Sequence, residues 1–428
     1  MSEWIECPLE TLADISSGGT PSRANPSFWN GHIPWVTPTD ITACQTNYLF
    51  DTRDTVTETG VSSSSAKLLP EGTLLLTSRA TIGELKIAAR PLTTNQGFKN
   101  LVPRPAVDGG FLFYQLSRSK AKFERYAAGS TFLEINRRDV GRVTIMLPRS
   151  TEVQQKIARI LQTIDQAIEK TQALIDKYKQ IRAGLMHDLF TRGIGPDGKL
   201  RPPREQAPEL YQETPMGWIP KEWDLLSIGD LCSQIADCPH STPKYRDSGI
   251  PCIRTADMLP GKLMLDKAYY VDEHDYINRI QRLKPREGDI IYSREGERLG
   301  IASPVGSEPV CLGQRVMILR PSEHVDPDFL LWMMNHIDFY RRVTKGLGAT
   351  TSPHINVGDI QRTHVFVPNL SEQVAIGGKL KSVQARLDNE EAFKAKVDRK
   401  KSGLVHDLLT GEVLVHVESK EERAVETA

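Results

Sequence analysis

Hydrophobic and polar positions follow two different patterns along this chain. From residue 1 to residue 149, short apolar runs such as Ile33-Pro-Trp-Val and Leu74-Leu-Leu-Thr alternate with clusters of Gly, Pro, Ser and Thr. This pattern predicts a β-rich domain whose strands are joined by turns. From residue 150 to residue 192, Gly and Pro almost disappear and apolar residues recur at heptad spacing. That stretch predicts one long amphipathic helix of roughly 60 Å.

The same order of patterns returns in the second half of the chain. Residues 223–369 are again predicted to be β-rich, and residues 370–414 to form a second long helix. Residues 129–161 resemble residues 348–380 at an offset of about 219 residues, which places Asn136 on Asn356. A duplicated unit of this size can carry a pseudo-two-fold axis within one polypeptide, and duplex DNA is a partner with the same symmetry.

The remaining segments complete the expected organisation. Residues 193–222 contain six prolines and are predicted to form a partly extended linker, and residues 415–428 form a charged, disordered tail. The first helix carries the chain from one head to the other, so the two helices must run antiparallel to bury their stripes on each other. The expected fold class is therefore α+β, with two β-rich globular domains separated by two long antiparallel coiled-coil helices.

The apolar stripe of each predicted helix is wider than the seam between two helices. Two isolated helices cannot cover three apolar rows each, so something else must pack on them. A partner protein over the outer row is the favoured interpretation, and heads that fold back onto the helices are the alternative. The residues predicted for the helix pair and its partner interface are Ile157, Leu161, Ile164, Ile168, Ile175, Tyr178, Leu185, Ile376, Leu380, Val383, Leu387, Phe393, Val397 and Leu404.

Composition and charge exclude several classes of protein. The chain has 428 residues, 25% of them charged, and a formal net charge of zero. No stretch approaches the roughly 20 apolar residues of a membrane span, and the N-terminus lacks the pattern of a signal peptide. We therefore expect a cytoplasmic protein with no membrane contact. The six cysteines form no CxxC pair, so they are expected to be reduced, and no metal site is predicted.

Catalytic motifs are missing from the sequence. No GxxxxGK[ST] loop, GxSxG elbow or HExxH helix motif occurs. The repeated pairs His187-Asp188 and His406-Asp407 lie near the ends of the two predicted helices, where a histidine can favour the negative end of the helix dipole. Since a metal-dependent hydrolase would need further ligands on other helices, we expect no catalytic residue in this chain.

Polar and basic loop residues in the two heads are the candidates for binding DNA. Arg can read guanine through two hydrogen bonds, Asn or Gln can read adenine, and Ser, Thr and Lys more often hold phosphates. The alternative for any one of them is an ordinary solvated or turn-stabilising side chain. The candidates are Arg23, Thr77, Ser78, Arg79, Asn95, Gln96 and Lys99 in the first head, and Lys244, Arg246, Arg254, Ser293, Arg294, Arg298, Gln314 and Arg315 in the second.

Motifs in a fixed order, twice over, carry a resemblance to a known family. They are the run Leu74–Gly83, Thr94-Asn-Gln-Gly-Phe, Gly129-Ser-Thr followed by Ile135-Asn136, and Leu147-Pro148 before Glu152, with Val367-Pro368 and Glu372-Gln373 in the second copy. With a long helix after each set, the chain resembles the specificity subunit of type I restriction-modification systems over almost its whole length. The second head departs from the pattern, since it has Leu312-Gly-Gln-Arg where the first has Thr94-Asn-Gln-Gly.

The resemblance implies a non-catalytic adaptor that reads DNA. Each head would be a target-recognition domain for one half of a bipartite double-stranded DNA site, and the helices would set the spacing between the halves. The resemblance also implies two methylation subunits, which carry S-adenosylmethionine and modify adenine, and restriction subunits, which use ATP and Mg. No cofactor is expected on this chain itself. The neutral net charge indicates that partners supply much of the grip on phosphates.

Two alternatives remain open at this point. The same reading module could serve a methylation-only system or another defence assembly. A protein–protein scaffold without a role on DNA is the third interpretation.

Overall fold

The structure is a computed structural model that describes residues 4–127, 133–296, 298–345 and 353–416. The chain divides into two compact units, which are described separately. Unit 1 combines residues 1–173 with residues 392–428, and unit 2 comprises residues 174–391. The predicted Gly129-Ser-Thr motif and most of the predicted charged tail lie outside the described residues.

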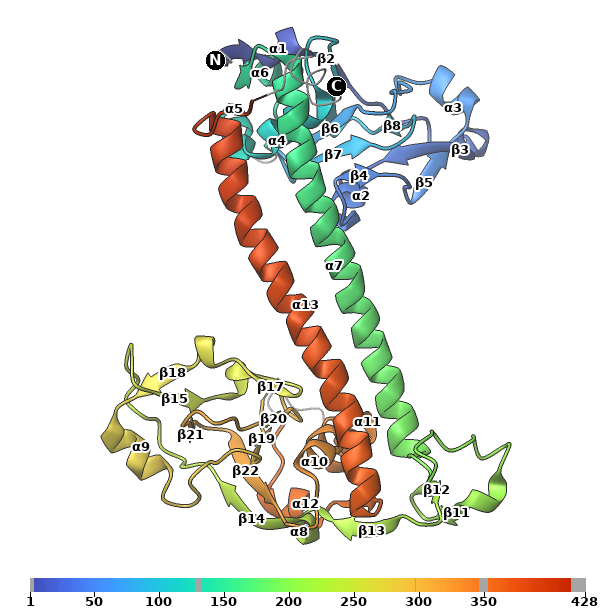
Figure 1. Cartoon of the computed structure of the whole chain (residues 1–428). Helices are drawn as coiled ribbons and strands as arrows, with labels where there is room; N and C mark the ends of the chain where they lie inside the picture. The colour runs from blue at the N-terminus through green and yellow to red at the C-terminus, as the bar shows by residue number, and fades with distance from the viewer. Residues whose placement is uncertain (1–3, 128–132, 297, 346–352, 417–428) are drawn as a thin grey trace, which may run out of the picture. The chain divides into compact units, whose positions relative to one another are not determined.

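The two predicted long helices are present and are almost the length expected. Helix α7 spans Thr151–Thr191 and helix α13 spans Leu370–Thr410, with 41 residues in each. A glycine ends the first helix: Gly193 follows α7 at φ 65°, and its N–H donates to the carbonyl of Asp188. Figure 1 shows the two helices as long continuous ribbons.

Within each unit the two helices are paired in antiparallel directions. In unit 1, Lys401 on α13 lies 2.5 Å from the Asp165 carboxylate on α7. In unit 2, Arg182 on α7 donates to the Gln384 side chain on α13 at 2.5 Å. A second contact gives the direction in each unit: Leu408 of α13 shares the unit 1 core with Ile157 of α7, and Lys179 of α7 lies 3.9 Å from Glu391 of α13 in unit 2. In both units a later position on one helix meets an earlier position on the other, which confirms the expected antiparallel pairing.

Three sheets make up the β-rich part of unit 1. Strand β1 (Trp4–Pro8) pairs antiparallel with β10 (Thr144–Pro148). A five-stranded sheet has the order β2-β9-β6-β7-β4, and a three-stranded sheet has the order β5-β3-β8. The strands of these two sheets are β2 Ala13–Ser17, β3 Trp29–Val36, β4 Tyr48–Leu49, β5 Asp54–Val56, β6 Leu74–Thr77, β7 Leu85–Ala88, β8 Thr93–Thr94 and β9 Phe98–Pro103.

Short helices close the core of unit 1. The segment Phe111–Tyr126 lies in two short helices, α4 and α5, because the chain turns between them at Ser119. Buried residues from β2, β6, β9 and α4 form one core with the first turns of α7. The short helices are α1 Leu9–Leu12, α2 Pro38–Ala43, α3 Glu58–Ser62, α4 Gly109–Ser117, α5 Lys120–Tyr126 and α6 Arg137–Arg142.

Unit 2 repeats this arrangement. Strand β13 (Asp224–Ser227) pairs antiparallel with β23 (His364–Val367), as β1 pairs with β10. A four-stranded sheet has the order β14-β22-β19-β20, and a three-stranded sheet has the order β18-β15-β21. The strands of these two sheets are β14 Cys232–Asp237, β15 Ile250–Ile253, β18 Tyr269–Val271, β19 Ile290–Ser293, β20 Ala302–Pro304, β21 Cys311–Leu312 and β22 Val316–Pro321.

The short elements of unit 2 also follow those of unit 1. Helices α10 and α11 occupy the place of α4 and α5, and β16 (Met258–Leu259) forms a small hairpin with β17 (Lys262–Leu263). Gln154 donates to the Pro148 carbonyl at 2.8 Å, and Gln373 donates to the Pro368 carbonyl at 2.9 Å. The predicted internal repeat is therefore present down to single hydrogen bonds. The helices are α8 Ile228–Leu231, α9 Glu273–Arg279, α10 Pro327–Met334, α11 Ile337–Val343 and α12 Val357–Arg362.

The ends of the helical stripe are covered by the heads. Ile157 and Leu161 belong to the core of unit 1, and Ile376 and Leu380 belong to the core of unit 2. At these ends β-strands and short helices of the heads bury the apolar rows, as in the alternative of heads that fold back onto the helices, and a partner over the outer row is not what covers them there. Of the predicted interface residues, Ile175 and Leu387 are also buried, and Ile164, Ile168, Tyr178, Leu185, Val383, Val397 and Leu404 are half-buried.

Apolar side chains farther along the helices remain exposed. The exposed fraction is 41% for Leu174, 38% for Ile181 and 50% for Phe393. Leu174 and Ile181 are one heptad apart, so they lie on one face of α7. These exposed apolar residues are therefore available for contact with a partner protein.

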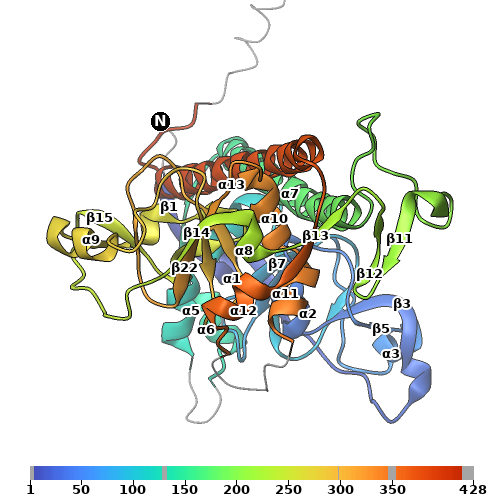
Figure 2. The same cartoon turned by 90° about the horizontal axis from the view of Figure 1, so that it is seen from below.

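The segment 193–222 is folded, and the prediction of a partly extended linker is wrong. Strand β11 (Tyr211–Thr214) and strand β12 (Gly217–Pro220) form an antiparallel hairpin. Ile194 and Ile219 enter the core of unit 2, so the prolines mark turns of a packed segment. Figures 1 and 2 show this hairpin on the side of unit 2 away from β15 and α9.

A buried ion pair fixes this segment to the start of α13. Arg201 and Glu372 are each 6% exposed, and Arg201 Nη2 lies 2.9 Å from Glu372 Oε2. The same carboxylate accepts hydrogen bonds from the Ile194 N–H at 2.7 Å and from Trp223 Nε1 at 3.2 Å. Glu372 therefore joins the end of one long helix to the beginning of the other within unit 2.

Within the described residues, no helix has the length and apolar character of a bilayer span.

Candidate nucleic-acid interface

Three of the predicted DNA-binding residues of the first head, Ser78, Arg79 and Lys99, meet Glu134 where β6 ends beside β9. The N–H of Ser78 donates to the Gly97 carbonyl at 2.8 Å, and the Ser78 carbonyl accepts from the N–H of Ile135 at 3.1 Å. These bonds bring the loop after β6 next to a segment that is more than 50 residues away in sequence. We call Ser78, Arg79, Lys99 and Glu134 the unit 1 cradle.

The unit 1 cradle contains one buried and one exposed cation around a single carboxylate. Lys99 is 4% exposed, and its Nζ lies 3.2 Å from Ser78 Oγ and 3.4 Å from Glu134 Oε1. Arg79 Nε lies 2.9 Å from the other oxygen of Glu134. Burial lowers the pKa of Lys99, and Glu134 counteracts this shift. Although burial opposes it, the pKa of Glu134 is lowered by the hydrogen bond from Arg79 and by the charge of Lys99.

The same backbone frame holds a different set of side chains in unit 2. The N–H of Arg294 donates to the Arg315 carbonyl at 3.1 Å, and the Arg294 carbonyl accepts from the N–H of Ile355 at 2.9 Å. Arg294 therefore occupies the place of Ser78, and Arg315 the place of Gly97. We call Asp237, Arg294, Glu295, Arg315 and His354 the unit 2 cradle.

The buried cation of the unit 2 cradle is an arginine. Arg294 is 4% exposed, and its Nε and Nη2 each donate to the Asp237 carboxylate at 3.0 Å. Its Nη1 also lies 3.2 Å from Nε2 of His354. Arg315 Nε lies 3.5 Å from Glu295 Oε1, and His354 Nδ1 lies 3.5 Å from Glu295 Oε2.

Charge is exchanged between equivalent positions of the two cradles. Arg79 forms an isolated β-bridge with Glu134, and Glu295 forms the matching bridge with His354. Arg79 of unit 1 is thus replaced by Glu295 in unit 2, and Glu134 is replaced by His354. The two heads share one backbone frame but present different hydrogen-bonding groups at its surface.

The other candidates in the first head are spread more widely. The Asn95 side chain accepts from the Gly97 N–H at 2.8 Å and so shapes the loop before β9. Gln96 is exposed and accepts from the Thr20 hydroxyl at 2.5 Å. Arg23 lies in a turn beside the other sheet, where its guanidinium carbon lies 3.6 Å from the ring centre of Trp29 in β3. A guanidinium stacked in this way can still donate from its edge to a phosphate or a base.

The candidates of the second head fall into two groups. Arg298 and Gln314 adjoin the unit 2 cradle, where they donate to backbone carbonyls of Ala256 and His240 at 3.1 and 2.9 Å. Lys244, Arg246 and Arg254 lie instead around the sheet of β15 and β18. The pairs and contacts of this second group are Arg246 with Asp272, the Lys244 N–H with Asp275, and Arg254 with Asp257 and the Tyr269 ring.

Burial corrects part of the candidate list. Thr77 and Ser293 are 0% exposed, and their hydroxyls bond to the backbone of their own loops. Ser78, Lys99 and Arg294 are also buried, so they hold neighbouring groups and do not face solvent. The physical reason is their place in the sheets: Thr77, Lys99 and Ser293 lie within the buried strands β6, β9 and β19, and Ser78 and Arg294 directly follow β6 and β19. Arg79 and Arg315 are the basic cradle residues that remain exposed.

Comparison with known proteins places this architecture in a family. The family described as "Type I restriction modification DNA specificity domain" matches residues 1–179 and 220–399. The chain belongs to this family. The two matched ranges correspond to the two copies of the internal repeat, and each includes its own cradle.

Individual relatives agree with this assignment of the specificity family. The chain is 27% identical over 376 residues to the type I restriction enzyme MjaIX specificity subunit of Methanocaldococcus jannaschii, covering 86% of this chain and 83% of the relative. It is 28% identical over 170 residues to the EcoR124I/EcoR124II specificity subunit of Escherichia coli, covering 37% of this chain and 41% of the relative. The fold is similar to the crystal structure of a type I restriction-modification S subunit from M. genitalium, with a TM-score of 0.61, 16% identity and coverage of 95% and 96% of the two chains.

Sequence reasoning missed the acidic side of both cradles in this family member. Glu134, Glu295 and Asp237 aim or neutralise the predicted basic residues, and His354 completes the unit 2 cradle. The only available signal was their position: Glu134 and His354 lie next to the repeated Ile135-Asn136 and Ile355-Asn356 pairs. A search confined to basic and amide residues passes over carboxylates that pair with them.

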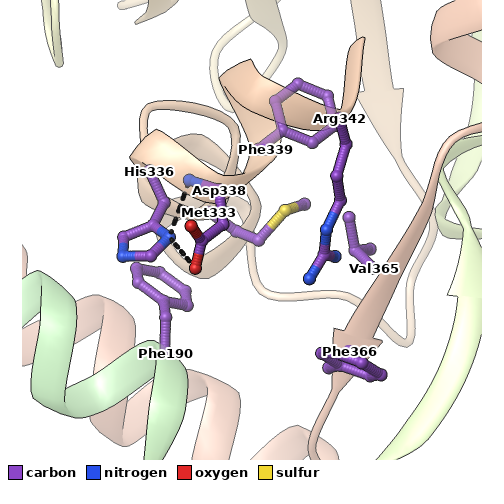
Figure 3. Close-up of a pocket in the computed structure, with 8 residues that line it drawn as sticks. All are labelled: Phe190, Met333, His336, Asp338, Phe339, Arg342, Val365 and Phe366. Carbon is purple, nitrogen blue, oxygen red and sulfur yellow. Dashed lines mark hydrogen bonds and ion pairs between the residues drawn. The ribbon is translucent and has the colours of Figure 1, made fainter. Parts of the chain in front are cut away.

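A separate pocket in unit 2 lies at the end of α7 (Figure 3). His336 and Phe190 lie close, with ring centres 5.3 Å apart, and Met333, Arg342 and Phe366 line other sides. The cavity measures about 30 Å³, which is space for about one water molecule. His336 Nδ1 accepts from the N–H of Asp338 at 3.4 Å and caps α11. The pocket therefore serves packing of the helix end and has no room for a ligand.

Proposed function

We propose that this chain is the DNA sequence-recognition subunit of a type I restriction-modification complex, in which each head reads one half of a bipartite site. The main observation behind this proposal is that the same backbone arrangement occurs in both units, with different side chains in the unit 1 cradle and the unit 2 cradle. A repeated frame suits two copies of one partner protein. Two different cradles suit two different DNA words.

Chemistry is assigned to partner subunits in this proposal. Two methylation subunits that carry S-adenosylmethionine would modify adenine, and restriction subunits would use ATP and Mg to move and cut DNA. Support comes from membership of the specificity family and from relatives whose names describe specificity subunits of restriction enzymes. The exposed Leu174, Ile181 and Phe393 on the long helices are available for such partners.

Reconstitution tests the proposal directly. The full chain, purified with its cognate methylation subunits, should methylate adenines only within one two-part DNA sequence. The chain alone should neither methylate nor cut DNA. Methylation at the same sequence when this chain is omitted would contradict the proposal, and sequencing of methylated bases in a random DNA library provides the measurement.

We further propose that the length of the two long helices sets the number of base pairs between the half-sites. Each helix is continuous across residues assigned to both units. Inserting one heptad within residues 165–180, with its match within residues 384–399, should change the spacer and leave both half-sites unchanged. Altered half-sites with an unaltered spacer would contradict this division of labour.

A further inference from the structure

Each cradle holds one exposed arginine against one carboxylate through the same nitrogen. Arg79 approaches Glu134 through Nε at 2.9 Å, and Arg315 approaches Glu295 through Nε at 3.5 Å. Among the described residues, neither guanidinium pairs with any other group. Their side chains are 46% and 55% exposed, and the contact with the carboxylate uses Nε and not the fork of the two terminal nitrogens.

An arginine bound at Nε is suited to read guanine. The terminal nitrogens form a planar fork that matches the O6 and N7 acceptors of guanine in the major groove. The carboxylate at Nε restricts the side chain and so lowers the entropy lost on binding. It also offsets the positive charge, which weakens attraction to a phosphate more than it weakens a geometrically matched base contact.

Backbone conformation adds an independent observation in unit 2. Arg315 has φ 67°, in the left-handed region that costs a residue with a β-carbon about 1 kcal/mol. The equivalent place in unit 1 is Gly97, which carries no side chain at all. Unit 2 therefore holds its arginine at a position where a glycine would fit without cost.

We infer that Arg79 and Arg315 are the guanine-reading residues of the two heads, aimed by Glu134 and Glu295. The inference rests on the proposed function. Arg79 follows strand β6 and Arg315 precedes strand β22, so the fork is presented from a different side of the shared frame in each head. The two heads consequently recognise a guanine at different positions of their half-sites.

The buried cations act as positioning residues in this arrangement. Lys99 lies 3.4 Å from Glu134 and helps to hold the carboxylate that orients Arg79. Arg294 is bound to Asp237 and lies beside His354, which in turn lies 3.5 Å from Glu295. Neither buried side chain reaches solvent, so neither contacts a base itself.

The test uses the full chain assembled with its cognate methylation subunits. Arg79→Gln and Arg79→Lys are compared with wild type for methylation of a randomised duplex library, and Arg315→Gln and Arg315→Lys are treated alike. Each variant should lose preference for one guanine in one half-site by about tenfold or more, with the other half-site unchanged. Arg104→Gln and Arg362→Gln are matched controls, because each removes an exposed arginine that pairs with a carboxylate elsewhere in its unit.

The lysine variants separate a base contact from a phosphate contact. Lysine keeps the charge and loses the fork, so a guanine reader should fail as Lys nearly as completely as it fails as Gln. A duplex with 7-deazaguanine at the identified position lacks the N7 acceptor. Wild type should bind this duplex less well than the unmodified duplex, whereas each variant should bind the two duplexes equally well. Rescue by lysine, or a uniform loss over all sequences with a smaller salt dependence, would establish a phosphate contact and overturn the inference.

Failure of the inference is distinct from failure of the proposed function. A wild-type two-part site that stays the same in all four arginine variants overturns only the assignment of Arg79 and Arg315. A wild-type complex without any two-part site overturns the proposed function together with this inference. Thermal melts of each variant confirm that the substituted chain is folded.

Discussion

The two units use different contacts to attach the start of a long helix to the rest of the unit. In unit 2 the closure is a buried ion pair between Arg201 and Glu372. The hydrogen bonds of Gln154 and Gln373 show that the place of Glu372 is occupied in unit 1 by Val153, which is 7% exposed in an apolar core. The same joint can therefore be built from hydrocarbon or from a satisfied buried charge pair, provided that every polar group finds a partner.

The C-terminal end of α13 is held in unit 1 mainly by apolar packing. Leu408 and Leu409 are buried in the unit 1 core, and the Leu409 carbonyl accepts from Gln115 Nε2 at 2.7 Å. Gly411 at φ 79° lies so close to Trp4 that a β-carbon would be 2.6 Å from the ring nitrogen. In unit 2, Gly193 lies equally close to the Trp223 ring. Both units therefore place a glycine after the long helix against a tryptophan, and they differ in the polar contacts around this pair.

Breaking the unit 2 ion pair should have the largest effect. Glu372→Val removes the buried carboxylate from Arg201, leaves only the exposed Glu222 beside the guanidinium and should lower the stability of unit 2 by about 3–5 kcal/mol. Chemical denaturation gives the energy, and hydrogen exchange of unit-specific peptides shows which unit is affected. Glu222→Gln is the control, since Glu222 also contacts Arg201 but is 60% exposed. Arg201→Met combined with Glu372→Val should recover most of the loss, and failure to recover would show that the apolar joint of unit 1 does not transfer.

Weakening the apolar packing of the end of α13 in unit 1 should have the next largest effect on stability. Leu409→Ala deletes a fully buried side chain and should destabilise unit 1 by about 3 kcal/mol without affecting unit 2. The exposed neighbour Thr410 provides a control through Thr410→Ala. Equal loss of protection in both units, measured by hydrogen exchange, would contradict separate closure of the two joints.

Relieving the strained arginine should stabilise unit 2 while impairing recognition. Arg315→Gly removes a left-handed β-carbon and should raise stability by up to about 1 kcal/mol. Ala80 has φ 57° at the place where unit 2 has Gly296, so Ala80→Gly is a control that relieves similar strain without removing a guanidinium. A destabilised Arg315→Gly chain in thermal melts would mean that the contact with Glu295 outweighs the strain.

The smallest expected difference concerns acid sensitivity. Burial lowers the pKa of His336 from its ordinary value of 6.5, whereas the neighbouring Asp338 raises it. The folded state therefore binds fewer protons than the unfolded state, and unit 2 should lose stability as pH falls below about 6.5. In unit 1 the same capping place belongs to Ser119, which does not titrate. Melts at pH 7.5 and 5 should show this component in wild type but not in His336→Asn, and an identical pH response of the two chains would refute it.

Local patterns in the sequence determined the larger features of this protein. Heptad spacing predicted both long helices to within a few residues, because helix periodicity is encoded in neighbouring positions. The repeated motifs predicted two similar heads and the specificity family. The antiparallel pairing of the two helices followed from the order of the segments along the chain.

Only the tertiary structure decided which polar residues are buried and with what they pair. Lys99 and Arg294 were indistinguishable from Arg79 and Arg315 in sequence, yet strands β9 and β19 take the first two into the interior. The partners of the exposed arginines also depend on contacts between distant segments, as between Arg79 and Glu134.

The proline-rich segment gives the same lesson. Its composition is typical of a linker, yet it folds into the unit 2 core, where Arg201 pairs with Glu372, 171 residues away in sequence. Periodicity records how a residue relates to its neighbours along the chain. The burial of a charge depends on a partner that periodicity does not specify, so it is decided when the chain packs.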